Sequence, residues 1–305
     1  VGCFIATILG LFVGILRLSK NWLVAKLMSA YIEGFRNVPV LLWIVMVFAL
    51  LTEFTPAPKA FKGTDPQATM LFSDSIAITN RGTYFPAPIF NEGSYWIVFV
   101  FILSVISIIF LKRYTNKLKR ETGKDFPIFL VSIAILIFPS TILFFALGSP
   151  ISLEYPYLKG FNFKDGIHLR NSFLALTLAL ALYTSAFIAE IVRAGIMAIS
   201  KGQTEAAASL GLRPNKIMNL IILPQALRII VPPLISNYLN LTKNSSLAIA
   251  VGYMDVRGTL GGITLNQTGR ELESMLLLMG FYLCVSLLIS SIINYYNRSF
   301  QIMVR

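Results

Sequence analysis

Oppositely charged residues stand three positions apart in two stretches that are otherwise apolar. Glu190 and Arg193 form one such pair, and Glu33 and Arg36 form the other. Residues three apart share a helix face, so each pair has the spacing of a local ion pair. Charges inside apolar segments are costly and tend to pair or to line a cavity. For Glu190 and Arg193, a structural ion pair and a gating role are both possible interpretations. For Glu33 and Arg36, the alternatives are an interfacial ion pair and a functional role, which would include the following Asn37.

A polar series follows two adjacent prolines late in the chain. Pro232 and Pro233 are predicted to break the helix, because neither donates a hydrogen bond and Pro233 clashes with the preceding turn. An interrupted helix with polar groups at membrane depth is typical of a substrate path. Lys243 would there attract a carboxylate, or else satisfy carbonyls exposed at the break. The series comprises Asn237, Asn240, Thr242, Lys243, Asn244, Ser245 and Ser246.

Other kinds of chemistry are not supported by the sequence. Cys3 and Cys284 lie in apolar runs and His168 is the single histidine, so neither a disulfide framework nor a metal site is predicted. The string Thr122-Gly123-Lys124-Asp125 lacks the first glycine and the hydroxyl of a phosphate-binding loop. We therefore expect no catalytic residue and no cofactor in this chain.

The composition is that of a membrane protein. Of the 305 residues, 56% are hydrophobic and 13% are charged, with a mean hydropathy of +0.72, whereas a soluble domain has about 25% charged residues. The net charge is +12, but the basic residues cluster between apolar runs, which indicates orientation in a lipid bilayer and no nucleic-acid partner. The chain is apolar from Val1, and we expect it to begin inside a truncated membrane helix.

Seven apolar runs are candidate membrane spans. Basic segments follow alternate spans, so 17–26, 112–125 and 199–223 are predicted to be cytoplasmic, as is the C-terminus with Arg298 and Arg305. The loops 53–93, 148–170 and 253–273 are predicted to be external, the first as a small cap or a linker. The organisation is then two visible spans in 1–52, an additional helix pair in 94–147, and a core in 171–300. The spans cover residues 1–16, 31–52, 94–111, 126–147, 171–198, 228–252 and 274–296.

The loop 199–225 between two spans reads locally as two short helices. Thr204 is predicted to cap the first, with Glu205 near its positive end, and Gly211 to take the left-handed position after it. Pro214 suits the first turn of the second helix, and Pro224 is predicted to end that helix. The inward face of the second helix comprises Ile217, Leu220, Ile221 and Leu223.

The same loop satisfies a spaced pattern, E-A-A-x₃-G-x₉-I-x-L-P. It resembles the EAA loop of permease subunits of ATP-binding-cassette importers. The strings 35–42, 186–196, 223–228 and 243–247 look like the polar amino acid branch of that family, and 53–170 looks like the larger subunits of general L-amino acid systems. The loop residues concerned are Gly202, Glu205, Ala206, Ala207, Gly211, Ile221, Leu223 and Pro224.

The resemblance implies an all-α, polytopic transmembrane helix bundle with a cytoplasmic coupling helix, in the bacterial cytoplasmic membrane. It also implies a cytoplasmic ATPase that holds ATP and Mg²⁺, a second permease subunit forming a heterodimer, and an external amino-acid-binding protein. The alternatives are a secondary transporter or channel without an ATPase, and a membrane anchor. The candidate path or gating residues are Arg36, Asn37, Glu190, Arg193, Asn240, Lys243, Asn244, Ser245 and Ser246.

Overall fold

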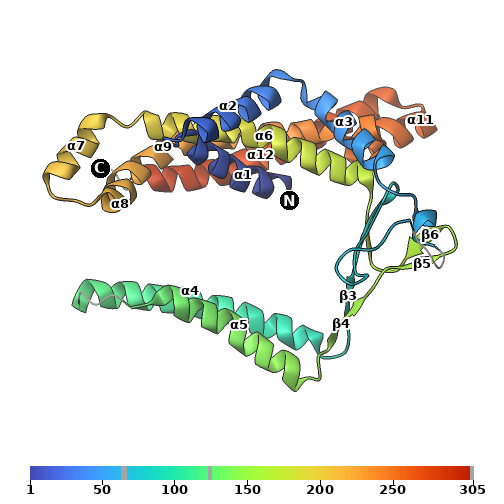
Figure 1. Cartoon of the computed structure of the whole chain (residues 1–305), viewed down its shortest axis with the longest axis horizontal. Coiled ribbons are helices and arrows are strands. Elements are labelled where there is room, and N and C mark those ends of the chain that lie inside the picture. The colour runs from blue at the N-terminus through green and yellow to red at the C-terminus, as the bar shows by residue number, and fades with distance from the viewer. Residues whose placement is uncertain (63–66, 123–125, 303–305) are drawn as a thin grey trace. The chain divides into compact units, whose positions relative to one another are not determined.

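The computed structural model describes residues 1–62, 67–122 and 126–302 and divides the chain into two compact units (Figure 1). The first unit comprises Val1–Pro56, Thr79–Arg81 and the chain from Arg170 onward. The second comprises Ala57–Ile78 and Gly82–Leu169. Gly123, Lys124, Asp125 and Arg305, named above in the loop and terminus assignments, lie outside the described residues.

The first unit is helical and is organised around α6 (Asn171–Met197), which buries side chains along its whole length. Figure 1 shows α1 and α2 lying along this helix, with α7 and α8 beyond its end. The other elements are α1 (Gly2–Arg17), α2 (Trp22–Asn37), α3 (Val40–Glu53), α7 (Lys201–Ser209), α8 (Pro214–Ile217), η2 (Met218–Ile222), α9 (Leu223–Asn244), η3 (Ser245–Val251), α10 (Val256–Gly258), η4 (Thr259–Thr264), α11 (Leu265–Thr268) and α12 (Glu271–Ile302).

Small residues allow α1 to approach α6 closely. A Cβ added at Gly10 would lie 2.6 Å from the Cβ of Ile188, and one added at Gly14 would lie 2.7 Å from the carbonyl oxygen of Ala189. Helices in lipid associate largely by van der Waals packing, which small residues four apart make possible. The two helices therefore form a tightly packed pair, with Ala6 fully buried in the same seam.

We expect Gly14→Leu to lower the stability of the protein, because the new side chain would enter the backbone of α6. Overpacking of this kind costs about 1–3 kcal/mol. The thermal unfolding midpoint in detergent should fall clearly relative to that of Gly34→Leu, since a Cβ at Gly34 meets nothing within 4 Å. Equal midpoints for the two variants would contradict the close α1–α6 contact.

The predicted span 31–52 is wrong as a single helix, because the chain breaks between α2 and α3. Val38 and Pro39 are both extended, with ψ of 134° and 135°. A residue that precedes proline is disfavoured in the helical region, and proline cannot donate to the preceding turn. Residues 31–37 therefore belong to the separate helix α2, so that 1–52 contains three helices.

Prolines predicted to interrupt the helices are instead accommodated. Pro232 and Pro233 lie inside α9, which continues to Asn244, and the change to a tighter 3₁₀ helix comes only at Ser245. Pro224 is the second residue of α9 and does not end the preceding helix, because the π-helical segment η2 leads directly into α9. A π turn widens the helix locally, which makes room for the proline ring. The predicted breaks at these positions are wrong.

The second unit combines a long helix pair with short strands. Its helices are α4 (Ser94–Thr122), α5 (Ile128–Ala146) and the short η1 (Pro58–Phe61). In a three-stranded sheet, β2 (Gly82–Phe85) lies between β1 (Ala77–Thr79) and β7 (Ile167–Leu169). Two further sheets are antiparallel strand pairs: β3 (Ala87–Phe90) with β4 (Ile151–Glu154), and β5 (Tyr157–Lys159) with β6 (Asn162–Lys164).

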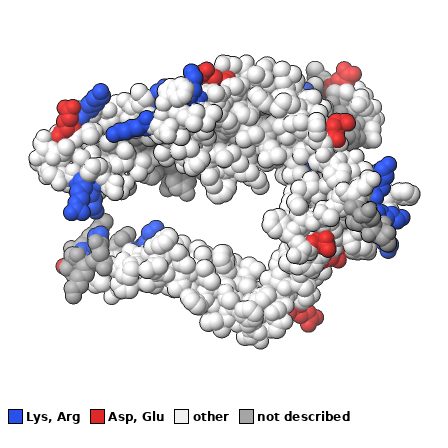
Figure 2. All heavy atoms as spheres, in the orientation of Figure 1, with Lys and Arg blue, Asp and Glu red and all other residues white. Residues whose placement is uncertain are grey.

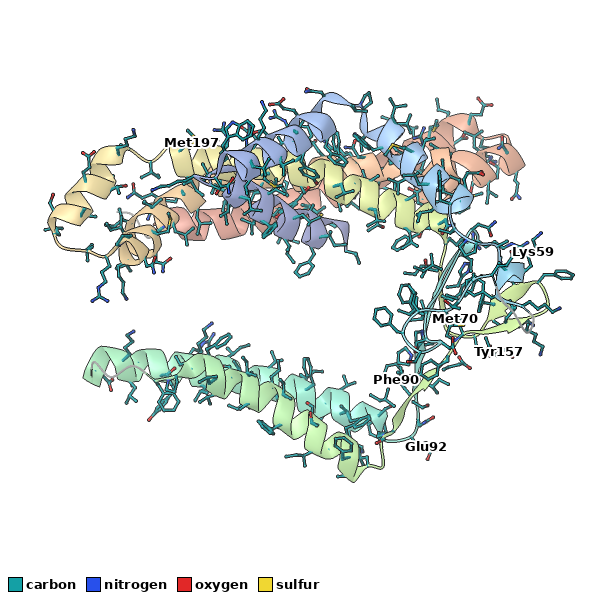
Figure 3. The ribbon with its side chains drawn as sticks, in the orientation of Figure 1. Lys59, Met70, Phe90, Glu92, Tyr157 and Met197 are labelled. Carbon is teal, nitrogen blue, oxygen red and sulfur yellow. The ribbon has the colours of Figure 1, made fainter. Side chains whose placement is uncertain are left out.

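A small core holds these strands together. Ala77, Tyr84 and Phe163 are buried there, with Phe61 and Met70, the latter labelled in Figure 3, packed against them. Most described residues of 53–93 and all but the last of 148–170 thus lie in one compact unit with the described part of 94–147, whereas the sequence predicted three regions.

Six helical stretches among the described residues are long and apolar enough to cross a membrane. Each overlaps a span predicted from the sequence, and Gly2–Arg17 is a shorter apolar helix that overlaps the seventh. On the face shown in Figure 2, most of the surface along α4 and α5 is uncharged. The stretches are Val40–Phe61, Ser94–Lys119, Ile128–Ala146, Asn171–Met197, Pro214–Val251 and Glu271–Asn294.

Candidate functional site

The loop between α6 and α9 begins with α7, an exposed helix of nine residues. Ser200, not Thr204, occupies the N-cap, so Glu205 is the fifth helical residue and lies beyond the first turn. The capping and dipole roles predicted for Thr204 and Glu205 are therefore wrong, because the helix starts four residues earlier. Gly202, Glu205 and Ala206 are exposed, whereas Ala207 is buried.

Gly211 ends α7 in the predicted left-handed conformation, with φ of +73°. The N–H of Gly211 donates to the carbonyl of Ala208 at 2.9 Å, and the N–H of Leu212 donates to the carbonyl of Ala207 at 3.3 Å. This pair of hydrogen bonds is a Schellman motif, which satisfies carbonyls at a helix end. A Cβ at Gly211 would meet nothing within 4 Å, so the backbone conformation, and not crowding, favours glycine.

The second half of the loop exposes apolar side chains. Pro214 is at the first position of α8, as predicted, and Ile217 is buried. Of the other residues predicted to face inward, Ile221 is half-buried, but Leu220 is 63% and Leu223 41% exposed. Leu210, which follows α7 directly, is 80% exposed. Exposed apolar side chains of this loop are candidate contact residues, and Leu210, which the sequence pattern did not single out, is the most exposed of these three leucines.

The polar series of α9 divides between two cavities. A cavity of about 300 Å³ between α6 and α9 contains Asn240 and Asn244, together with Tyr183, Thr184, Phe187 and Asn237. A second cavity of about 700 Å³ contains Lys243 and Ser246, and α12 lines much of it. The candidate path residues therefore do not form one site, because successive positions on a helix point in different directions. Ser245 lies in neither, and its hydroxyl donates to the carbonyl of Thr242 at 2.7 Å.

Arg257 contributes a second cation to the larger cavity. Its Nη1 donates to the carbonyl oxygen of Ser246 at 3.0 Å, which holds the side chain against the start of η3. No spacing pattern singled out this residue, because it comes 14 positions after Lys243 in a segment predicted to be a loop. The available clue to Arg257 was its position two residues after Asp255, which caps helix α10.

Glu33 and Arg36 do not form the predicted ion pair among the described residues. The guanidinium of Arg36 instead lies 5.3 Å from the centre of the Phe187 ring, in the range of a cation–π contact. Phe187 also lines the smaller cavity, whereas Arg36 is not among the residues that line it. Asn37 is exposed at the last position of α2.

Glu190 forms the predicted ion pair with Arg193, whose Nη2 lies 2.6 Å from Oε1 of Glu190. A second partner comes from far away in the sequence, because Nη1 of Arg17 contacts Oε2 of the same carboxylate. Arg17 also donates from Nε to the hydroxyl of Ser29 at 3.1 Å. Glu190 therefore connects α6 with α1 and, through Arg17, with α2.

Metal-ligating side chains do not gather anywhere in the described part of the chain, where no group of three or more His, Cys, Asp or Glu residues is found. Both cysteines are free. The notable features of the described residues are thus an exposed helical loop, two cavities beside α9 and an ion-pair junction at Glu190.

Comparison with known proteins gives the family. Residues 118–301 match the family described as the binding-protein-dependent transport system inner membrane component. The glutamate/glutamine/aspartate/asparagine transport system permease protein BztB of Rhodobacter capsulatus is 53% identical over 314 residues, covering 95% of this chain and 73% of that protein. The general L-amino acid transport system permease protein AapQ of Rhizobium johnstonii is 40% identical, covering 100% and 74%.

A solved structure has a similar fold. The crystal structure of an amino acid ABC transporter with histidines superposes with a TM-score of 0.53 at 20% identity, covering 98% of this chain and 86% of that chain. This chain belongs to the family of inner membrane permease components of binding-protein-dependent ABC transport systems. It is a multi-pass protein of the bacterial inner membrane.

Proposed function

We propose that this chain moves polar or general L-amino acids into the cytoplasm and that ATP hydrolysis on a separate subunit drives this transport. The names of the relatives support the substrate class, since they are permeases for amino acids. The observation that carries the coupling to an ATPase is the loop from Lys201 to Pro224, in which the exposed helix α7 ends in a Schellman motif and exposed apolar side chains follow.

The proposal assigns this loop to the cytoplasmic side, with α7 as the coupling helix. Leu210, Leu220 and the face of α7 around Glu205 would contact the ATPase, which holds ATP and Mg²⁺. An exposed helix received in a groove can transmit rigid-body movement to the spans attached at its ends. A second permease subunit, forming a heterodimer, and an external amino-acid-binding protein complete the proposed complex.

For the substrate path, we propose the two cavities beside α9. The smaller offers amide groups of Asn240 and Asn244, which can bind uncharged polar groups. The larger offers the cations of Lys243 and Arg257, which suit a carboxylate. An L-amino acid carries both kinds of group, so the pair of cavities supports polar amino acids as the substrate class.

The experiment is to purify the detergent-solubilised complex through a tag on this chain and to identify its other subunits by mass spectrometry. We expect a P-loop ATPase and a second permease. Reconstituted with its binding protein, the complex should take up radiolabelled L-glutamate, L-glutamine, L-aspartate or L-asparagine only with ATP. Uptake without ATP, by a complex that lacks an ATPase, would support a channel or secondary transporter instead.

A further inference from the structure

Glu190 is the meeting point of three helices. Its carboxylate accepts from Arg193 on its own helix and contacts Arg17 on α1, and Arg17 donates in turn to Ser29 on α2. The side chains of Arg17, Glu190 and Arg193 are only 19%, 24% and 28% exposed, respectively. One carboxylate is thus shared by two guanidinium groups in a largely enclosed place.

The two ion pairs differ in what they fix. Arg193 is three residues from Glu190, so the geometry of α6 alone brings these groups together. Arg17 is 173 residues away, so its contact with Glu190 exists only while α1 lies in its present position against α6. Shielded ion pairs add little net stability, but removing one partner leaves an uncompensated charge. The main effect of the Arg17–Glu190 ion pair is therefore to fix the position of α1 against α6.

The ion-pair junction at Glu190 lies close to the loop 199–225 that carries α7, which we call the coupling loop. Glu190 is seven residues before Met197, the last residue of α6, which Figure 3 labels at the end of that helix. Helix α7 begins four residues further on, at Lys201. Seven residues are about two helical turns. A displacement of α7 thus reaches α6 directly, and reaches α1 and α2 through the junction.

The glycine contacts between α1 and α6 complement the ion pair between Arg17 and Glu190. Gly10 and Gly14 bring α1 against the backbone of α6, one to two turns before Arg17. Close packing resists separation of the helices, but apolar contacts alone do not fix sliding or rotation. A directional ion pair at the end of the seam adds that restraint.

We infer that Glu190 is a positioning residue that makes α1 and α2 follow α6 when the coupling loop moves, through its bridge to Arg17. This inference rests on the proposed function, because it requires an ATPase that moves the loop. Without the bridge, ATP hydrolysis would continue but would move less substrate for each ATP consumed.

The test uses the complete complex, purified through this chain and reconstituted with its binding protein in proteoliposomes. The measured quantity is the number of radiolabelled amino acid molecules moved per ATP hydrolysed. Arg17→Gln should lower this ratio about fivefold while ATP hydrolysis persists. Lys20→Gln removes a nearby exposed charge that has no ion pair within the described ranges, and it should leave the ratio unchanged.

Further variants separate positioning from general stability. Arg193→Gln removes only the contact within α6 and should lower the ratio less than Arg17→Gln does. Combining Arg17→Gln with Glu190→Gln should be no worse than Glu190→Gln alone, because Glu190→Gln already removes the bridge to Arg17. A ratio unchanged in Arg17→Gln, or a change confined to complex yield and melting temperature, would overturn the inference. A parent complex without ATP-driven uptake would overturn the proposed function itself.

Discussion

Gly211→Asp is expected to reduce the ATPase recovered with this chain at least tenfold, while the chain still folds and inserts. Gly211 closes the Schellman motif at the end of α7 with φ of +73°. Aspartate is among the residues that tolerate this conformation, and a Cβ there meets no atom of this chain within 4 Å. The fold can therefore accept the substitution, and the new carboxylate would enter the apolar contact surface beside Leu210.

Gly211→Asn is the matched control, because asparagine has nearly the same shape, tolerates the same backbone conformation and carries no charge. It should retain most of the ATPase, as judged by quantitative mass spectrometry of the purified complex. A tenfold loss corresponds to about 1.4 kcal/mol of binding free energy, which an unpaired buried charge readily costs. Parent-like recovery in Gly211→Asp would show that this end of α7 lies outside the contact.

Local features of the site could be predicted from the sequence. The left-handed residue at Gly211 follows from glycine after a run of helix formers, and the Glu190–Arg193 pair follows from a spacing of three. Both depend on residues within one or two turns. The start of α7 was misplaced because three residues near it, Ser200, Thr204 and Glu205, are each compatible with a helix beginning.

Features that depend on tertiary structure could not be predicted. The contact of Arg17 with Glu190 joins residues 173 positions apart, and no periodicity connects them. Pro232 and Pro233 break an isolated helix, but α9 continues through them in its packed setting. The separation of Asn240 from Lys243 into different cavities likewise depends on where α6 and α12 pack against α9.

Lys243→Met is expected to lower amino acid uptake at least tenfold without changing the subunits recovered. Lys243 lies in a candidate membrane span and borders the larger cavity with Arg257. Within the part of the chain that the structure describes, no carboxylate pairs with it. A cation in a span is costly unless a partner or water compensates it, and the carboxylate of a passing amino acid would be such a partner.

The comparison with Lys243→Arg makes this prediction specific to charge. Arginine preserves the cation but changes its shape and hydration, so uptake should recover partly, to within about threefold of the parent. The neutral Met approximates the length of the apolar stem, so packing against Leu276 and Met279 should be largely kept. ATP hydrolysis without substrate should be equal in all three complexes, because the residue is remote in sequence from the coupling loop. If Lys243→Met takes up amino acids at the parental rate, the larger cavity lies off the substrate path, and the amide-lined cavity of Asn240 and Asn244 becomes the next site to test by substitution.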